Sequence, residues 1–423
     1  MMIEQPGATL PLVTIFGPPG SALSYAIRDF LYRSDVPFHW VQLATDAQAR
    51  SEAGVEHLAD TRLPICVFAD GTRLECPTVR QITAQLGWFH TPLRAEYDLA
   101  IYGAGPAGLS AAVYGASEGL KTVLIERYTL GGQAGSSSRI ENYLGFPSGI
   151  SGAELAERAR AQVQRFGAEI LLGHAGVRAD CAPHQMGAEL EDGTKIVARA
   201  TICATGVAYR RLGLAHEERF EGAGLFYGAG ASEAALMGGQ RVFVVGGGNA
   251  AGQAAMHFAQ AACHVTIVIR GSSLKSTLSQ YLIDRIAATP NINVLTQTEI
   301  TALDGDNVLQ QITLTDRITG QSRTVATRWL FVCIGGEPQT AWAREAGIVR
   351  DAGGYLVTGP DLVHNRRCPA HWPLDREPYY LETSMPGLFA AGDVRHGSIK
   401  RCASAVGEGA MAVALVHRYL ANG

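Results

Sequence analysis

The sequence predicts an α/β protein in which three strand–helix units follow one another along the chain, because apolar strand-like runs alternate with helical patterns. The first unit precedes the segment WFHTPLRAE. The second is EYDLAIYGAGPAGLSAAVYGASEGLKTVLIE, and the third is RVFVVGGGNAAGQAAMHFAQAACHVTIVIR. The last two each have an apolar run, a glycine-rich turn, a helical segment and a second apolar run, which is the pattern of parallel βαβ units.

The composition is that of a globular protein with more than one core. The chain has 423 residues, of which 47% are hydrophobic and 17% are charged, and this length predicts about two to four domains. The formal net charge of −4 provides no basic field for nucleic acid or for an anionic membrane surface. The N-terminal residues MMIEQPGATL do not resemble a signal peptide, and no apolar run approaches the ~18 residues of a membrane span. We therefore expect a cytoplasmic protein without membrane or nucleic-acid partners.

The eight cysteines predict neither a disulfide framework nor a metal centre. No two of them are spaced as CxxC. Several lie inside apolar runs such as PICVF, ATICATG and WLFVCIGG, where a cysteine acts as a small buried hydrophobe. His364, Cys368 and His371 do not have a recognised metal-ligand spacing. We expect no bound metal.

Residues 1–92 are predicted to form one small α/β unit. Its expected elements, in order, are a strand at LVTIF, a helix at SALSYAIRDFLYRSD, a strand at PFHWVQL, a hairpin at LPICVFADGTRLECP and a helix at TVRQITAQLGW. Ser21 is the expected N-cap of the first helix, and the hairpin is expected to turn at Asp70 and Gly71.

This order of elements resembles the thioredoxin/glutaredoxin fold, but the redox thiols of that fold are missing. Pro64 falls where that family keeps a proline, often in the cis form. The segment PGSALS stands where the family has its CxxC, so Ser21 and Ser24 stand in the places of the two thiols. A serine hydroxyl has no accessible redox chemistry. The resemblance therefore implies a docking or structural module.

The first glycine-rich turn has the features of a dinucleotide-binding loop. It consists of Gly103, Ala104, Gly105, Pro106, Ala107 and Gly108. Gly103 allows the tight turn, Gly105 lets the backbone approach a pyrophosphate, and Gly108 lets the helix pack on the strand. The helix N-terminus supplies free N–H groups to the phosphates, and Glu126, at the end of the next strand, is placed to accept hydrogen bonds from ribose hydroxyls. This combination of strand, loop, helix and acid predicts a Rossmann-like domain.

The second glycine-rich turn predicts a second dinucleotide. It consists of Gly246, Gly247, Gly248, Asn249, Ala250 and Ala251. The strand that follows ends in Arg270, with Lys275 close behind, where the second unit has the acid Glu126. Cations at this position suit a 2′-phosphate, so the sequence favours NADPH over NADH. The alternative is that both are ordinary surface charges.

From Tyr97 to its end, the chain resembles the low-molecular-weight thioredoxin reductase branch of the pyridine-nucleotide disulfide oxidoreductases. Beyond the two loops, the matching segments are Gly131-Gly132-Gln133, Glu141-Asn142-Tyr143-Leu144-Gly145-Phe146-Pro147, Ala204-Thr205-Gly206, Gly335-Gly336-Glu337-Pro338, Ala391-Gly392-Asp393 and Lys400-Arg401-Cys402. The resemblance implies FAD in the first Rossmann-like domain, NADPH in the second, and a homodimer.

The same resemblance implies roles for these segments. Those containing Gly132, Gln133 and Asn142 lie along the flavin in the family. Thr205 and Gly206 end the strand that leaves the FAD domain, and Gly335-Gly336-Glu337-Pro338 forms the return crossing. Gly392 and Asp393 hold the ribityl or pyrophosphate part of FAD. Lys400, Arg401 and Cys402 open the last helix, whose positive end would stabilise a reduced flavin.

The implied domain order is discontinuous. A thioredoxin-like domain without CxxC occupies residues 1–92, and the FAD domain occupies 93–208 and 338–423. The nicotinamide domain, 209–337, is inserted between the two halves of the FAD domain.

The chain departs from the family at the redox pair. In a thioredoxin reductase the CxxC precedes the second glycine loop, and here that stretch reads LFYGAGASE, with Gly228 and Ala231 at the cysteine positions. No thiolate can form there, so this site has no charge-transfer thiol and no dithiol relay. The usual route of thioredoxin reduction is therefore excluded.

Three further features have two interpretations each. Cys402 is either a redox thiol, with its pKa lowered by the helix end, or a small packing residue. Tyr227 acts either near the flavin or as an aromatic packing contact. The insertion at residues 361–384 covers the active site, mediates a dimer contact, or is a solvated loop.

The leading functional hypothesis is an NADPH-dependent FAD oxidoreductase with an acceptor other than a CxxC protein, either a small molecule or a small electron carrier. Candidate acceptors are ferredoxin or flavodoxin, a quinone, oxygen and a small organic disulfide. One alternative is a flavin oxidase of a small molecule with a vestigial nicotinamide domain. The other is a redox sensor or scaffold that binds FAD without turnover. No catalytic residue can be assigned from the sequence.

Overall fold

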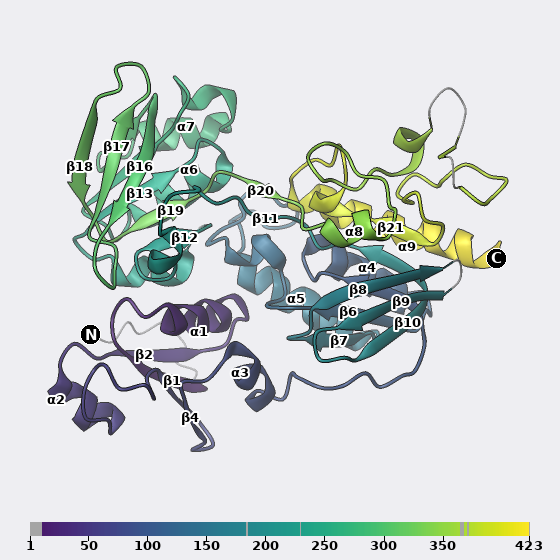
Figure 1. Ribbon diagram of the computed structural model, residues 1–423, viewed down its shortest axis with the longest axis horizontal. Helices are drawn as coiled ribbons and strands as arrows, with labels where there is room; N and C mark the ends of the chain where they lie inside the picture. Colours follow the sequence, from purple (N-terminus) through teal and green to yellow (C-terminus); the bar gives the residue numbers. More distant parts are fainter. Residues whose placement is uncertain (1–10, 183–184, 229, 364–367, 370–371, 423) are drawn as a thin grey trace. The chain divides into compact units, whose positions relative to one another are not determined.

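The computed structural model describes residues 11–182, 185–228, 230–363, 368–369 and 372–422. The chain forms two compact units, each built from two separate stretches (Figure 1). The first unit comprises residues 1–82 and 211–335, and the second comprises 83–210 and 336–423.

The N-terminal part of the first unit is a four-stranded sheet with the order β2-β1-β3-β4. Its elements are β1 (Val13–Gly17), α1 (Ala22–Arg33), β2 (Phe38–Gln42), α2 (Asp46–Gln48), the π-helical turn η1 (Ala49–Ala53), β3 (Ile65–Phe68), β4 (Arg73–Glu75) and α3 (Val79–Gln85). β1 pairs with β2 in parallel and with β3 antiparallel, and β3 pairs antiparallel with β4. The five elements expected here are confirmed, and the peptide bond between Leu63 and Pro64 is cis.

Local signals explain where α1 begins and why α2 and η1 were not predicted. The Ser21 side chain accepts a hydrogen bond from the backbone N–H of Ser24 at 3.1 Å, which confirms Ser21 as the N-cap. Thr45 caps α2 in the same way through the N–H of Gln48. α2 and η1 are too short to show a helical periodicity in the sequence.

The rest of the first unit is a parallel five-stranded sheet with the order β12-β19-β13-β14-β15. Its strands are β12 (Leu225–Tyr227), β13 (Arg241–Val245), β14 (His264–Val268), β15 (Ile292–Leu295) and β19 (Leu330–Val332). Helical segments are η3 (Glu217–Phe220), η4 (Ala231–Leu236), α6 (Asn249–Phe258), η5 (Leu274–Ser276) and α7 (Gln280–Ala287). β16 (Thr298–Asp304), β17 (Gln311–Asp316) and β18 (Ser322–Ala326) form a separate antiparallel sheet. Phe258 and Phe331 pack at 4.3 Å between ring centroids in the core of this unit.

The second unit is built on a seven-stranded sheet with the order β7-β6-β5-β10-β9-β8, in which β21 also pairs with β10. Its strands are β5 (Tyr97–Tyr102), β6 (Thr122–Glu126), β7 (Glu169–Leu172), β8 (Gly176–Ala182), β9 (Gln185–Leu190), β10 (Lys195–Cys203) and β21 (Leu388–Ala390). Helical segments are α4 (Pro106–Ser117), η2 (Gly132–Ser136), α5 (Gly152–Arg165), α8 (Ala341–Glu345), η6 (Gly359–Leu362), η7 (Gly392–Val394) and α9 (Cys402–Ala421).

Two features of the second unit position its cofactor segments. α9 lies along α4 (Figure 1), and Ser110 of α4 donates a hydrogen bond from Oγ to the carbonyl of Val406 at 2.8 Å. The two crossings expected from the sequence lie side by side, because β11 (Ala208–Tyr209) pairs antiparallel with β20 (Gly336–Glu337).

Across the described part of the chain, no helix combines the length and the apolar character needed to cross a membrane.

Candidate dinucleotide-binding sites

The first glycine loop joins β5 to α4 and requires glycine at two positions for steric reasons. Gly103 has φ +97, and a Cβ there would lie 2.5 Å from the carbonyl oxygen of Ala204. A Cβ on Gly108 would overlap the carbonyl oxygen of Gly103. Glycine is therefore required at both positions by close backbone contacts within the protein, as the sequence predicted for the turn and for helix–strand packing.

Gly105 in the same loop has a different environment. It is the N-cap of α4 with φ −70, and Pro106 occupies the first helical turn. A Cβ on Gly105 would have no neighbour nearer than the Cα of Gly132, at 4.0 Å. The protein itself does not require glycine here, and the open space beside the helix N-terminus suits a phosphate that approaches the backbone. Ala107, the next residue of α4, is buried.

Glu126 ends β6, and hydrogen bonds from two backbone N–H groups, one of them in the first glycine loop, orient its carboxylate. Its Oε2 accepts a hydrogen bond from the N–H of Ala104, and its Oε1 accepts one from the N–H of Tyr128, both at 2.8 Å. Each carboxylate oxygen can accept a further hydrogen bond, so the arrangement suits two ribose hydroxyls.

The segment after β6 lies against the same loop. Gly131 donates its N–H to the carbonyl of Ala104 at 2.8 Å, and Gly132 faces Gly105. The Gln133 side chain donates to the carbonyl of Val207 at 2.6 Å, which ties this segment to the strand crossing. Residues that the sequence separates are thus brought together: the loop, 131–133 and the region after Thr205 and Gly206. Asn142 and Thr205 are exposed.

Gly392 and Asp393 follow β21 beside the N-terminal turn of α4. Gly392 has φ +76, and a Cβ there would lie 3.0 Å from the Cβ of Ala107. Burial raises the pKa of Asp393, whereas the Lys400 ammonium lowers it. Lys400 donates from Nζ to the Asp393 carbonyl at 2.8 Å and to Ser398 Oγ at 2.9 Å. Lys400 therefore orders the Asp393 segment.

The start of α9 distinguishes between the two interpretations of Cys402. Arg401 is the exposed N-cap of α9, and Cys402 is its first residue. The pKa of the Cys402 thiol is raised, by burial first and by the neighbouring Asp393 second. The redox interpretation of Cys402 required a pKa lowered by the helix end, but loss of hydration and a nearby carboxylate raise it, which favours the packing interpretation.

The second glycine loop joins β13 to α6, and its first and third glycines have the same two kinds of environment as Gly103 and Gly105 in the first loop. Gly246 has φ +138, and a Cβ there would overlap the carbonyl oxygen of Cys333. Gly248 is the N-cap of α6, and a Cβ there would meet nothing within 4 Å. Asn249 exchanges two hydrogen bonds with Ser279, both at 2.8 Å, so its side chain ties the loop to the start of α7. Ala250 is exposed.

Two exposed cations follow β14, which ends at Val268, two residues before the end expected from the sequence. Within the described residues, neither the Arg270 guanidinium nor the Lys275 ammonium makes a hydrogen bond or an ion pair through its side chain. Arg317 adds a third cation that sequence reasoning missed. Its Nη1 donates to the Arg270 carbonyl at 3.2 Å, and its Nε lies 3.4 Å from Glu299 Oε2. A contact across 47 positions leaves no local signal in the sequence.

Comparison with known proteins agrees with this geometry. Residues 97–409 match the family model of the pyridine nucleotide-disulphide oxidoreductases. The chain belongs to this family. Family members of the thioredoxin reductase type bind FAD and use NADPH, so this pyridine nucleotide-disulphide oxidoreductase is a flavoprotein with FAD- and NADP-binding Rossmann folds.

Several relatives share this part of the oxidoreductase. A thioredoxin reductase from Streptomyces clavuligerus is 33% identical over 322 residues, which cover 76% of this chain and 93% of the relative. The Bacillus subtilis thioredoxin reductase is 32% identical, with 77% and 95% covered. The crystal structure of Lactococcus lactis thioredoxin reductase in its FR conformation matches with a TM-score of 0.68 at 27% identity, covering 77% of this chain and all of that one. The T. acidophilum enzyme matches with a TM-score of 0.67 at 29% identity, with 77% and 99% covered.

The segment that precedes the second loop of this oxidoreductase is held by backbone contacts. Gly228 has φ +93, and its N–H donates to the Val332 carbonyl at 2.9 Å. Its own carbonyl accepts a hydrogen bond from the Cys333 thiol at 3.4 Å, and burial raises the pKa of that thiol to about 12. Ala229 lies outside the described residues, and Ala231 begins η4.

The Tyr227 side chain makes contacts within its own unit that are typical of a packed residue. Its hydroxyl accepts a hydrogen bond from the N–H of Leu212 at 3.2 Å, and the Arg211 guanidinium carbon lies 5.2 Å from its ring centroid. Burial raises the pKa of Tyr227 to about 12. These contacts favour the packing interpretation of Tyr227.

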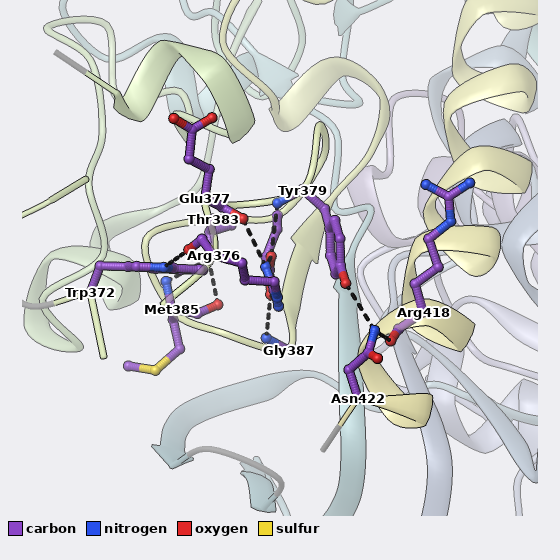
Figure 2. A network of polar contacts seen from close by, with 10 residues as sticks. Trp372, Arg376, Glu377, Tyr379, Thr383, Met385, Gly387, Arg418 and Asn422 are labelled. Atoms are coloured by element: carbon purple, nitrogen blue, oxygen red, sulfur yellow. Dashed lines mark hydrogen bonds and ion pairs between the residues drawn. The ribbon is translucent and has the colours of Figure 1, made fainter. Parts of the chain in front are cut away.

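The insertion at residues 361–384 contains a network of polar contacts that includes Trp372, Arg376 and Tyr379 (Figure 2). Glu382 is fully buried and forms an ion pair with Arg376 at 2.6 Å, and it also accepts hydrogen bonds from the N–H groups of Tyr379 and Gly387. The Arg376 guanidinium carbon lies 3.8 Å from the centroid of the Tyr379 ring, and the Trp372 indole donates to the Arg376 carbonyl at 2.6 Å. The C-terminal part of the insertion is therefore packed against the unit and is not simply a solvated loop.

His364 and His371 lie outside the described residues. Among the residues that the structure does describe, no group of three or more histidine, cysteine, aspartate or glutamate side chains could hold a metal ion.

Proposed function

We propose that the protein is an FAD-dependent oxidoreductase that takes hydride from NADPH and passes electrons to an acceptor other than a CxxC protein. The observation that carries this proposal is the combination of two dinucleotide loops with a chain in which no two cysteines are spaced as CxxC. NADPH supplies two electrons as hydride, and FAD accepts them and can release them one or two at a time.

The FAD site is assigned to the second unit. The backbone N–H groups of Gly105, Ala107 and Gly108 at the start of α4 would hold the pyrophosphate beside Pro106, which has no N–H, and Glu126 would hold the ribose. Gly132, Gln133 and Asn142 would flank the flavin, and Thr205 and Gly206 would lie at the end of the strand that leaves the FAD domain, as the family resemblance implies. Gly392, Asp393, Lys400, Arg401 and Cys402 complete the proposed site.

The NADPH site is assigned to the first unit. Gly246, Gly248 and the N-terminal turn of α6, with Asn249 and Ala250, would face the pyrophosphate. Arg270 and Lys275 would contact the 2′-phosphate. Both cations are exposed, and their charges are not neutralised by neighbours among the described residues, which is what a phosphate-binding pair requires.

The proposed acceptor follows from the residues at the family's redox positions. Gly228 and Ala231 would stand where a thioredoxin reductase has its cysteines. The thiol in contact with Gly228 belongs to Cys333, and it is buried, with a raised pKa. One inert thiol cannot relay two electrons through a disulfide. The acceptor is therefore a small molecule or a small electron carrier that reacts with the flavin itself.

The N-terminal part of the first unit is proposed to be a thioredoxin-like domain without redox function. Its sheet order, with β1 parallel to β2 and antiparallel to β3, supports the resemblance. Ser21 caps α1, and Ser24 is buried. The proposed domain limits are 1–92 for this domain, 93–208 and 338–423 for the FAD domain, and 209–337 for the nicotinamide domain, in a cytoplasmic homodimer.

Anaerobic titration with NADPH tests the proposal. One equivalent of NADPH should bleach the flavin absorbance, and turnover should follow when a quinone or ferricyanide is added. Thioredoxin and dithionitrobenzoate should not be reduced. Rapid bleaching followed by efficient consumption of oxygen alone would indicate an oxidase that uses NADPH, whereas a flavin that NADPH does not reduce would overturn the proposal in favour of a sensor or a vestigial nicotinamide domain.

A further inference from the structure

Helix α1 of the N-terminal part is buried on two sides, although a helix that only covers its own sheet needs one apolar face. Ser24 faces the sheet, because a Cβ on Gly17 of β1 would lie 2.6 Å from the Ser24 Oγ. Arg28 and Asp29 are also buried, with 6% and 9% of their surface exposed. Their burial requires a second partner for the helix.

That partner is the nicotinamide-binding part of the same unit. The Tyr25 ring meets the Phe226 ring edge-on, with 4.9 Å between centroids. A Cβ on Gly222 would lie 3.0 Å from both the Cα of Ala22 and the Cδ1 of Tyr25. Ala22, Tyr25 and Arg28 are three residues apart along one stripe of α1, and this stripe is the contact surface.

A buried ion pair lies at one end of this surface. The Arg28 Nη2 contacts both carboxylate oxygens of Glu233, at 2.9 and 3.0 Å, and Glu233 is 2% exposed. The Arg28 guanidinium carbon also lies 4.3 Å from the centroid of the Trp40 ring. The cation therefore contacts an aromatic ring of its own domain and a carboxylate of the nicotinamide part. Burial raises the pKa of Glu233, and Arg28 opposes that shift. Removing one partner while the domains stay docked would leave the other charge buried and unpaired, which is strongly destabilising.

The position of the surface matters for the function proposed above. Its partners Gly222, Phe226 and Glu233 belong to the stretch that contains Gly228 and Ala231, the two positions where the family has thiols. α1 therefore contacts this stretch on both sides of the two positions.

We propose that the N-terminal domain is a built-in, permanently bound partner of the nicotinamide domain, and that its α1 stripe occupies the surface formed by Gly222, Phe226 and Glu233 and so closes that surface to any external protein. The docked domain takes no part in electron transfer and does not need to move during turnover. The consequence for electron acceptors rests on the proposed function, but the docking itself does not.

A disulfide between the two domains tests whether they stay docked during turnover. The ideal Cβ of Gly222 lies 3.4 Å from the Cβ of Ala22, close to the separation in a disulfide. The double variant Ala22→Cys/Gly222→Cys should cross-link under mild oxidation, as shown by peptide mapping without reductant. Ala22→Cys/Gly239→Cys is the matched control, because Gly239 has a similar φ of +69, but a Cβ there would have no neighbour within 4 Å.

The outcomes separate this proposal from the proposed function. The cross-linked protein should reduce ferricyanide with NADPH within about twofold of the rate of the Gly222→Cys single variant. A failure to cross-link, equal cross-linking of the control, or a loss of turnover that reductant restores would overturn permanent docking. A native protein whose flavin is not reduced by NADPH would overturn the proposed function, while the cross-linking result would still stand.

Hydrogen exchange of the full-length protein provides a second test. Arg28→Met should accelerate exchange in α1 and in residues 222–233 together, by roughly 100-fold or more, because Glu233 loses its counter-ion. Arg28→Met/Glu233→Leu should restore much of the protection, since an apolar pair can replace a buried ion pair. Arg158→Met removes an exposed ion pair with Glu154 and should change neither segment. Acceleration in α1 alone, or no rescue by the double variant, would show that Arg28 supports only its own domain.

Discussion

Single residues at the ends of two strands account for the difference between the cofactor sites. β6 ends in Glu126, whose carboxylate is oriented by two backbone N–H groups, and β14 is followed by the exposed cations Arg270 and Lys275. A carboxylate suits ribose hydroxyls and repels a 2′-phosphate, whereas a cation attracts it. The assignment of Glu126 to ribose hydroxyls and of Arg270 and Lys275 to a 2′-phosphate stays a prediction, made from the residue type at each position.

Replacing Arg270 tests the cation assignment. Arg270→Ala should weaken NADPH binding by ~1–3 kcal/mol, the range for losing a charge-assisted contact, and should leave NADH binding nearly unchanged. Dissociation constants for the two cofactors measured by fluorescence titration check this. Arg241→Ala is the control, because Arg241 is exposed at the opposite end of β13. Equal weakening for both cofactors would mean that Arg270 supports the fold.

Cys402 tests whether a thiol takes part in turnover. Burial and Asp393 raise the pKa of its thiol, so the thiolate is scarce near neutral pH and alkylation should be slow. Raising the pH should speed its modification, because the thiolate fraction grows as the pH approaches the raised pKa. Iodoacetamide treatment at pH 7, followed by mass spectrometry and by an NADPH oxidation assay, should show activity that outlasts the modification of the exposed Cys76 and Cys263. Activity that disappears with the labelling of Cys402 would assign it a redox role.

At the scale of elements, the glycines of one loop serve two different purposes. Gly108 makes room for the backbone of its own turn, whereas Gly105 borders open space. The sequence already distinguished them, because their places in the motif predict helix–strand packing for Gly108 and the approach of a pyrophosphate for Gly105.

Two alanine substitutions separate these purposes. Gly108→Ala should destabilise the unit by several kcal/mol, since its Cβ would overlap the Gly103 carbonyl, and should lower the melting temperature even of the FAD-free protein. Gly105→Ala should fold normally, because φ −70 accommodates alanine, and should weaken FAD binding. Thermal unfolding and FAD titration of both variants distinguish these effects. An unstable Gly105→Ala, or a Gly108→Ala of native stability, would contradict this division of roles.

At the scale of the whole molecule, the chain is organised in two units that do not follow the order of the sequence. Residues 1–82 share a unit with 211–335, although the second glycine-loop domain is far away along the chain. Ligands of the two units should therefore stabilise different parts of the protein.

Ligand-dependent hydrogen exchange tests this organisation. NADP⁺ at about 100 times its dissociation constant should stabilise the first unit by ~2.7 kcal/mol, and the protection should extend to α1, because unfolding of the whole unit releases the ligand. Removing FAD should instead accelerate exchange in α4 and α9. Protection by NADP⁺ that stops at residues 241–335 would show that the N-terminal part opens independently.

The sequence by itself determined the α/β class, the helices after both glycine loops, the N-cap at Ser21 and the absence of a CxxC. Each of these depends on residue types within one short stretch, where steric fit, capping and periodicity act locally. Only the tertiary structure decided that Gln133 is tied to Val207, that Asn249 holds Ser279, and that Arg317 lies beside Arg270. It also decided that Arg28 finds Glu233, 205 positions away, and so joins the N-terminal part to the nicotinamide part. Such pairs leave no local pattern, because their energy comes from burial and from partners that meet only after the chain has folded.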